Sequence, residues 1–505
     1  MKRLQLPRPG FGVLATLLML GGCRSSEIRD PEYTDILDSV ASIDVDGGWD
    51  NRSLAPVMPD LAGPHPVEDY ITVALSQNPQ IQAARKRVEA LAHRVPQAAS
   101  LEDPMLGVMG FPFHPNVPQT ASGRATAGVT ASQKVPWFGK LQTAAEAAEA
   151  EVDFGRAELA AAELEVVEQV KLAYYQLYYI QQATGITEEN RELLGQFEQI
   201  ARVKYEVERA VSQQDVLRAQ VELSNLDREL IRLEQELLSA QADLAQVLHI
   251  SPETELRAVT ELPREQAPRD IQRLYELAVA SRPELHAQLA EIERDHRLVE
   301  LAQLQYFPDL TLSVDWREMS TSGSISPVAD GIDDVGLGLT INVPIYRKRL
   351  DAGVREAEAR AVSDARQYDA LRDRTLKGVK DLFARVRSQE RLVRLFRDDI
   401  IPKSDQTLQV SIPDYQVGRI DFLQLIDNWQ QLLRFRITLY ELEAQLRQSL
   451  ASLERVVGGE ALEEQMGEQT PENPENGNPP PSAPADVDAQ REPPLRTLDS
   501  PRGED

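Results

Sequence analysis

The sequence is poor in the residue types on which most enzyme and metal chemistry depends. A single cysteine, Cys23, among 505 residues excludes an internal disulfide and any cysteine-rich metal site. Six histidines are scattered without the spacings that bind zinc. The chain also lacks a nucleophile-elbow motif and a paired cysteine and histidine. We therefore predict no catalytic residues, no metal site and no enzymatic activity.

Positive charge, aromatic residues and long apolar runs are also scarce. The 54 Lys and Arg face 81 Asp and Glu, a formal charge of −27, which argues against nucleic acid as a partner. Aromatics make up 6% of the chain and hydrophobic residues 42%. With a mean hydropathy of −0.37, the chain is too polar for a multi-helix membrane protein and too apolar for a wholly disordered one.

The N-terminus has the pattern of a secretion signal. A basic start precedes an apolar run over about residues 11–20, which is too short to span a bilayer as a helix. Gly21 and Gly22 before Cys23 resemble a bacterial lipobox, in which the cysteine carries a covalent lipid. The alternative is an ordinary signal with an incidental cysteine. Because residue 24 is Arg rather than Asp, the lipobox interpretation predicts an anchor in the outer membrane.

The body of the chain is a tandem duplication. Four short matches occur in the same order in both halves: 74–81 with 278–285, 103–106 with 307–310, 134–137 with 342–345, and 205–209 with 415–419. We therefore divide the chain into a signal peptide (1–22), a lipid-anchored extended arm (23–66), two repeats (67–265 and 270–458) and a disordered tail (459–505) rich in Pro, Glu, Asn and Gly.

Each repeat predicts a helix, two strands and a very long helical stretch. In the first repeat, 67–99 is mostly helical, with Pro79 opening a second helix after a break. Residues 139–203 lack proline and predict a rod of about 95–100 Å at about 1.5 Å per residue, followed by a helix over 211–249. Helices of this length and composition favour coiled-coil packing over a globular core.

The strands predict a membrane-spanning sheet. Apolar and small polar residues alternate over 125–132, 310–316 and 335–343, and less regularly over 104–112. A half-buried soluble sheet would show the same period, but aromatics near the strand ends favour a membrane. Four strands cannot close a barrel, and open edges are costly in lipid, so the chain must oligomerise. Three copies supply twelve strands and leave a lumen.

These features together resemble the TolC family of outer-membrane efflux factors. The resemblance rests on the lipobox, the duplicated halves, prolines at strand starts (Pro104, Pro308), strand exits at 135–136 and 343–344, and paired Tyr-x-Val-x-Arg turns. It implies a homotrimer whose twelve-stranded β-barrel in the outer membrane continues as an α-helical barrel across the periplasm. It also implies a passive duct served by a periplasmic adaptor protein and an inner-membrane pump of the RND type.

The resemblance further implies a functional tip at two helix-to-helix turns, near 204–217 and 414–427. It places adaptor docking at Tyr205, Arg209, Ser212, Tyr415, Gly418 and Arg419. Gate candidates are Asp427, Asp421 and Asp215, whose carboxylates would ring a narrow passage; the alternative is that they are ordinary solvated acids. Gly418 suits a positive φ at a tight helix end.

The cargo is less closely defined by the sequence. Residues 133–141 are most similar to the heavy-metal-efflux branch, which implies metal cations as the exported solutes. Two alternatives stay open: a periplasmic coiled-coil lipoprotein without a pore, and a type I protein-secretion duct. Apart from the lipid on Cys23, we predict no cofactor.

Overall fold

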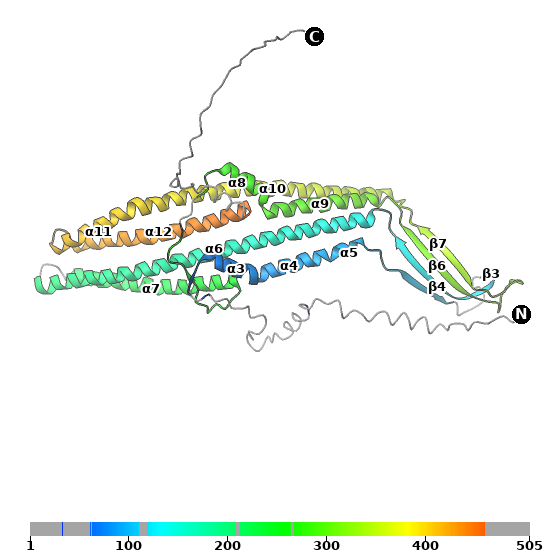
Figure 1. The fold of residues 1–505 in the computed structure, drawn as a ribbon, viewed down its shortest axis with the longest axis horizontal. Coiled ribbons are helices and arrows are strands. Elements are labelled where there is room, and N and C mark those ends of the chain that lie inside the picture. The colour runs from blue at the N-terminus through cyan, green and yellow to red at the C-terminus, as the bar shows by residue number, and fades with distance from the viewer. Residues whose placement is uncertain are drawn as a thin grey trace, which may run out of the picture.

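The computed structural model describes Tyr33, Leu61 and residues 63–110, 119–208, 213–263 and 267–459. The molecule is a long rod with helices running side by side at one end and a β-sheet at the other (Figure 1). The signal peptide, Cys23, most of the 23–66 arm and the tail beyond Gly459 lie outside the described residues.

The helices of the first repeat follow the predicted order. α3 (Val67–Gln77), α4 (Pro79–Ala92) and α5 (Arg94–Ala99) precede the sheet, and α6 (Lys140–Val203) and α7 (Gln213–Leu248) follow it. The break predicted before Pro79 is present, because Asn78 caps α4 by accepting a hydrogen bond from the Gln80 backbone N–H at 2.8 Å. The 64-residue α6 confirms the predicted rod.

The second repeat has the same order with more interruptions. α8 (Ile271–Ser281) and α9 (Pro283–Leu304) precede its strands. The long helical stretch after them consists of α10 (Arg347–Leu395), a π-helical segment η3 (Phe396–Ile400), α11 (Ile401–Gln416) and α12 (Phe422–Val457). Two short strands, β1 (Pro64–His65) and β5 (Arg257–Ala258), pair in parallel beside the helices and were not predicted.

The main sheet is antiparallel with the order β2-β4-β6-β7. Its strands are β2 (Met105–Gly110), β4 (Gly123–Val135), β6 (Leu310–Ser320) and β7 (Asp334–Ile341), and the short β3 (Gln119–Thr120) pairs with β4. β4 and β6 are longer than the alternating patterns predicted, because polar residues continue the pairing beyond the apolar stretch.

The register places apolar side chains together on one face of the sheet. Leu312 pairs with Leu339 and Val314 with Leu337. Leu337 is 86% exposed, and the other apolar residues of β7 are also open to the surroundings. Because no second layer of the described residues covers this face, the sheet does not pack on a core of its own chain. This arrangement is the one predicted for a lipid-facing sheet.

An ion pair between a buried lysine and a half-buried aspartate joins the two repeats where the sheet meets the helices. The Lys140 ammonium group lies 2.7 Å from the Asp309 carboxylate and donates a second hydrogen bond to the Phe307 carbonyl at 3.0 Å. The Trp137 ring stacks on Phe307 with centroids 5.5 Å apart. Residues from the first strand exit and the second strand entry are thereby held together.

The helices bury narrow stripes rather than a thick core. One cluster, around Tyr174 and Leu244, lies midway along the rod, and another, around Trp429 and Phe422, lies toward the tip. In the described part of the chain, no helix is both long and apolar enough to cross a membrane.

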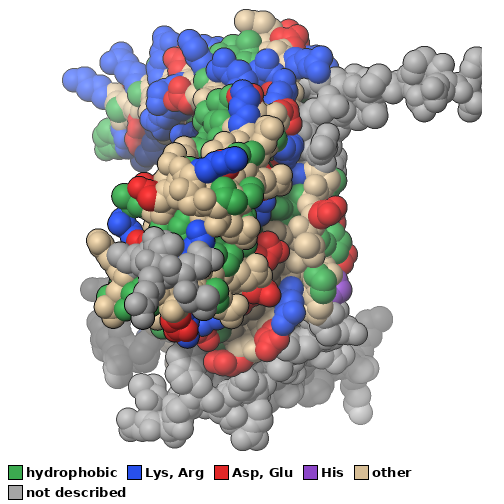
Figure 2. Space-filling view, turned by 90° about the vertical axis from the view of Figure 1, so that its left-hand side faces the viewer, with side chains coloured by type: hydrophobic (Ala, Val, Ile, Leu, Met, Phe, Trp, Pro, Cys, Tyr) green, Lys and Arg blue, Asp and Glu red, His purple; other side chains and the backbone are tan. Residues whose placement is uncertain are grey.

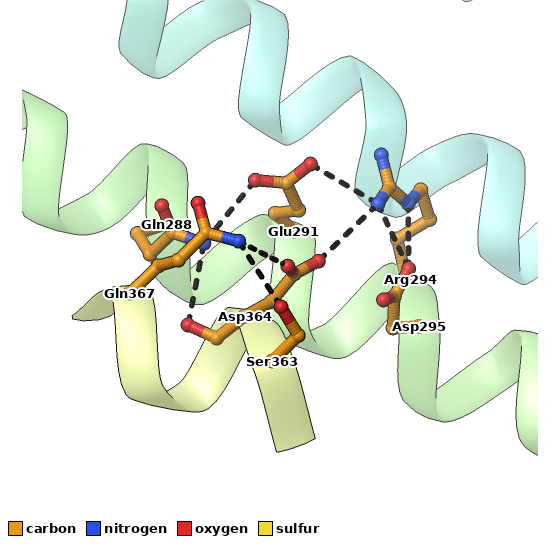
Figure 3. A network of polar contacts seen from close by, with 7 residues as sticks. All are labelled: Gln288, Glu291, Arg294, Asp295, Ser363, Asp364 and Gln367. Atoms are coloured by element: carbon orange, nitrogen blue, oxygen red, sulfur yellow. Dashed lines mark hydrogen bonds and ion pairs between the residues drawn. The ribbon is translucent and has the colours of Figure 1, made fainter. Parts of the chain in front are cut away.

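A polar network links α9 and α10 (Figure 3). Arg294 contacts Glu291 at 3.1 Å, Asp295 at 2.8 Å and Asp364 at 3.7 Å. Asp295 is 2% exposed, and its Oδ2 has no hydrogen-bond donor among the described residues. Burial, a hydrogen bond with the Asp295 carboxyl group and the charge of Glu291 raise the pKa of Asp364, and Arg294 only partly opposes this. One guanidinium therefore faces three carboxyl groups.

We predict that Asp364→Asn stabilises the protein at neutral pH. Because the pKa of Asp364 is higher in the folded than in the unfolded protein, its protonated form stabilises the folded state at pH values below the ordinary carboxyl pKa. This stabilisation is lost as the pH rises through the pKa of Asp364 in the folded protein. The asparagine amide would remove the repulsion and offer Asp295 a donor. Thermal unfolding should show a Tm gain of a few °C near neutrality and little or none at about pH 4.

The matched control is Asp373→Asn, which changes a 74% exposed carboxylate on the same helix. It should leave the Tm nearly unchanged at both pH values. A loss of stability in Asp364→Asn at neutral pH would show that the network is fully compensated.

Candidate functional site at the helical tip

The two predicted turns meet at the end of the rod opposite the sheet (Figure 1). The first begins with the π-helical segment η2 (Lys204–Glu208) and ends where α7 starts at Gln213. Arg209 and Ser212 lie outside the described residues. The second turn occupies residues 417–421, between α11 and α12. Tyr205, in the first turn, is 41% exposed.

The second turn is closed by backbone hydrogen bonds around Gly418. Its N–H donates to the Tyr415 carbonyl at 3.0 Å, and the Arg419 N–H donates to the Asp414 carbonyl at 2.8 Å. Gly418 has a φ of 74°, which confirms the positive φ predicted for it. The Arg419 side chain lies outside, 3.1 Å from the Asp414 carboxylate.

Tyr415 supports this turn from below. It is 2% exposed, so Gly418 and Arg419 form the outer surface of the turn and Tyr415 does not. Its ring packs on Phe422 with centroids 5.4 Å apart. Tyr415 therefore supports the turn from the inside, and the exposed residues of this turn that are predicted to contact a docking protein are Gly418 and Arg419.

Lys204 connects the two turns. Its buried ammonium group donates to the Tyr415 carbonyl at 2.7 Å and lies 4.8 Å from the centroid of the Tyr415 ring. The role of Lys204 was not predicted from the sequence. The only signal was a basic side chain directly before the repeated Tyr-x-Val-x-Arg pattern, which does not by itself predict a buried contact.

Two of the three gate candidates lie near each other. Burial and the charge of Asp421 raise the pKa of Asp215, while Arg218 opposes the shift. Burial and the charge of Asp215 raise the pKa of Tyr415 to about 12. Asp215 thus lies within electrostatic range of both Asp421 and Tyr415 across the two turns, although these residues are about 200 positions away in sequence.

Asp421 also has a local structural task. It is the N-cap of α12, where its side chain accepts a hydrogen bond from the Gln424 N–H at 2.8 Å. Asp427, further along α12, is exposed and makes no hydrogen bond or ion pair within the described residues. Of the three acids, Asp427 is therefore the one whose carboxylate is most available to another chain or to a solute.

Buried polar contacts fix the helices below the turns. The Trp429 indole N–H donates to the Asn190 side-chain oxygen at 3.0 Å, which joins α12 to α6. The Asn428 amide donates to the Ser411 hydroxyl at 2.8 Å, which joins α12 to α11. Because both bonds lie at buried or half-buried positions, they define the rotation of α12 and hence the direction in which Asp427 points.

The family follows from a comparison with known proteins. The model of the family described as outer membrane efflux protein matches residues 70–248 and 274–459, most of the chain. The chain belongs to this family.

Individual relatives agree with this assignment. The efflux protein is 22% identical over 413 residues to the cobalt-zinc-cadmium resistance protein CzcC of Cupriavidus metallidurans, a match covering 80% of this chain and 93% of CzcC. Its fold is similar to that of the outer membrane protein VceC of Vibrio cholerae, with a TM-score of 0.64, 19% identity and coverage of 78% of this chain and 96% of VceC. For CusC the TM-score is 0.65 at 20% identity, over 78% of this chain and 92% of CusC.

The predicted fold class and function are therefore confirmed. The chain has the fold of a TolC-type subunit, a β-sheet continued by long helices, and it is an outer-membrane efflux channel protein. This assignment favours the efflux duct over a spacer without a pore and over a protein-secretion duct.

We predict that Gly418→Ala loosens the second turn of the efflux protein. No atom lies within 4 Å of the position a Cβ would take, so the cost is that of a left-handed backbone alone. That cost is about 1 kcal/mol. Hydrogen exchange over residues 413–425 should accelerate several-fold.

The control is Gly195→Ala inside α6, eight residues before its end, where a Cβ also meets open space but the backbone is helical. Alanine should stabilise that position slightly. Equal exchange in the Gly418→Ala variant and the wild type would show that the turn does not depend on the positive φ.

Proposed function

We propose that three copies of this chain close into one outer-membrane duct that exports metal cations. The observation that carries the proposal is a sheet with a lipid-compatible face and two open edges. Among the described residues β2 and β7 each pair on one side only. Every neighbouring pair is antiparallel, so β2 and β7 run in opposite directions and β7 of one copy can continue into β2 of the next.

Closing the sheet into a barrel removes the main free-energy cost of placing it in lipid, which is that of the unpaired backbone groups at its edges. Each unpaired backbone N–H or C=O in hydrocarbon costs several kcal/mol, about the cost of losing a hydrogen bond in a solvent that offers none. Three times four strands makes a twelve-stranded barrel, which is wide enough for an open lumen. Cyclic closure of identical subunits also satisfies every edge with a single type of contact.

The helices present matching apolar stripes on opposite flanks of one chain. Figure 1 places α7 along one side of the rod and α10 with α11 along the other. Each flank has apolar side chains that are 39% to 68% exposed: Leu217, Val221, Ile231 and Leu238 on α7, and Leu392, Leu395, Val410 and Val417 on α10, α11 and the following turn. Contact between these stripes in neighbouring copies would continue the sheet seam into a helical barrel.

Metal cations are supported by the CzcC relationship and by charge. The name of CzcC states resistance to cobalt, zinc and cadmium. At the tip of this chain, Asp215 and Asp421 lie together and Asp427 is exposed, so a threefold ring would concentrate negative potential in the mouth. Such a ring favours cations over anions.

The remaining parts of the system follow from the same proposal. A duct with no energy source needs a periplasmic adaptor, which would contact the two turns at the predicted residues Tyr205, Arg209, Ser212, Gly418 and Arg419. The adaptor would connect the duct to an inner-membrane pump of the RND type. A lipid on Cys23 would hold the N-terminal arm in the inner leaflet of the outer membrane.

Deletion of the gene tests the cargo. We expect the deletion strain to become more sensitive to cobalt, zinc or cadmium, and the full-length gene to restore tolerance. Dyes and antibiotics serve as the comparison panel. Unchanged metal tolerance together with dye or antibiotic sensitivity would overturn the proposal that the cargo is metal cations. It would still agree with the protein being an efflux duct.

Asp427→Ala tests the gate. Single-channel recording of purified trimers should show a several-fold higher leak in the closed state, because the carboxylate ring would no longer attract the basic groups that hold the mouth together. The control is Asp243→Ala, which removes an exposed acid far along α7 from the tip. Identical conductance of Asp427→Ala and wild type would remove Asp427 from the gate.

A further inference from the structure

Charge is distributed unevenly between α10 and the end of the chain. α10 contains fourteen Lys and Arg against eight Asp and Glu, although the whole chain carries a charge of −27. Residues 460–505 contain twelve Asp and Glu against three Arg, a net charge of −9. Six of these acids are glutamates within 460–475, a stretch without a basic residue. A basic helix and an acidic tail are thus parts of the same chain.

The acidic tail starts beside the basic helix. A Cβ on Gly378 of α10 would lie 3.6 Å from Val456, near the end of α12. Gly458 follows α12 with a φ of 111° and packs so closely on Ser281 that a Cβ would lie 2.7 Å from its backbone. The first glutamate of the tail, Glu460, is therefore only a few residues from the point where α12 touches α10.

The nearest basic side chains on α10 point away from its packed face. Val379 and Val386 are buried against α8 and α12. Arg374, Lys377 and Lys380 recur every three residues on adjoining turns and are exposed. Lys377 is 79% exposed and its contact with Asp381, at 3.4 Å, is also solvent-exposed. Within the described residues, Arg374 and Lys380 form no ion pair.

The basic side chains of α10 lie at a different level of the rod from the apolar stripe proposed to contact a neighbouring copy. The exposed apolar residues Leu392 and Leu395 lie nearer the tip, whereas the basic turns lie beside α8 at mid-rod. Figure 2, which looks onto the tip end, shows Lys and Arg side chains gathered over the upper part of the molecule, where Figure 1 places α8 and α10. An acidic segment, rather than another apolar helix, is the complement of such a face.

We propose that residues 460–475 of the C-terminal tail dock on the basic face of α10 formed by Arg374, Lys377, Lys380 and Arg385. Each exposed ion pair contributes at most about 1 kcal/mol. The tether, however, gives the glutamates an effective concentration in the millimolar range. Several such pairs hold the tail reversibly and in a salt-dependent way.

Zero-length carbodiimide coupling tests the docking in the full-length membrane-inserted protein. The reagent joins a carboxylate to an amine only when the two are in contact, with loss of water. Mass spectrometry should find isopeptide links from glutamates within 460–475 to Lys377 and Lys380, at least about tenfold more than to Lys348 or Lys403. About 0.5 M salt should reduce the links several-fold.

Lys348 and Lys403 are the matched controls because both are exposed lysines at other levels of the same helical stretch. Links distributed equally over all four lysines, or no links from 460–475, would overturn the proposal.

A second measurement uses hydrogen exchange over residues 373–386. Changing Glu460, Glu463, Glu464 and Glu468 to glutamine should accelerate exchange there and not over 350–360, and an unchanged rate would also overturn it.

Discussion

The unpaired edges of the four-stranded sheet are the constraint on which the whole molecule depends. One face of the sheet is apolar and uncovered, so it belongs in hydrocarbon, where β2 and β7 cannot leave their backbone groups without partners. A chain with this sheet is therefore incomplete by itself. The exposed apolar stripes on α7 and on α10 with α11 would extend the proposed contact between copies along the helices, beyond the bilayer.

A molecule built in this way has no thick hydrophobic core. Specific polar contacts therefore help to hold its helices in a defined arrangement. Lys204 reaches the Tyr415 carbonyl, Trp429 reaches Asn190, and Lys140 reaches Asp309, each from a different element. These bonds have strict geometry, unlike the contacts between small apolar residues along the rods. They define how each helix is rotated, and rotation decides which acids and which apolar stripes a subunit presents to its neighbours.

Features encoded locally were predictable, and long-range partnerships were not. The period-two pattern gave the strand faces, Pro79 gave the helix break, and Gly418 gave the turn, because each depends on a few adjacent residues. The Lys204 and Trp429 contacts join residues more than 200 positions apart, and no local pattern encodes them. Asp421 shows an intermediate case. It is a predicted gate residue, and the Gln424 spacing three positions later is also that of a helix cap, a second role that the structure shows and the sequence analysis does not mention.

The Lys140–Asp309 pair has a consequence for symmetry. Lys348 is the counterpart of Lys140 in the second repeat, yet it is exposed and forms no ion pair within the described residues, while Met105 stands opposite Asp309 in the duplication. A ring of three copies would contain six similar repeats. The contacts between neighbouring repeats would be of two kinds, within a chain and between chains, and this ion pair would stabilise only those within a chain. The shape of the ring would have approximate sixfold symmetry, but the strength of its contacts would have only threefold symmetry. A widening of the ring would therefore start at the three contacts between chains.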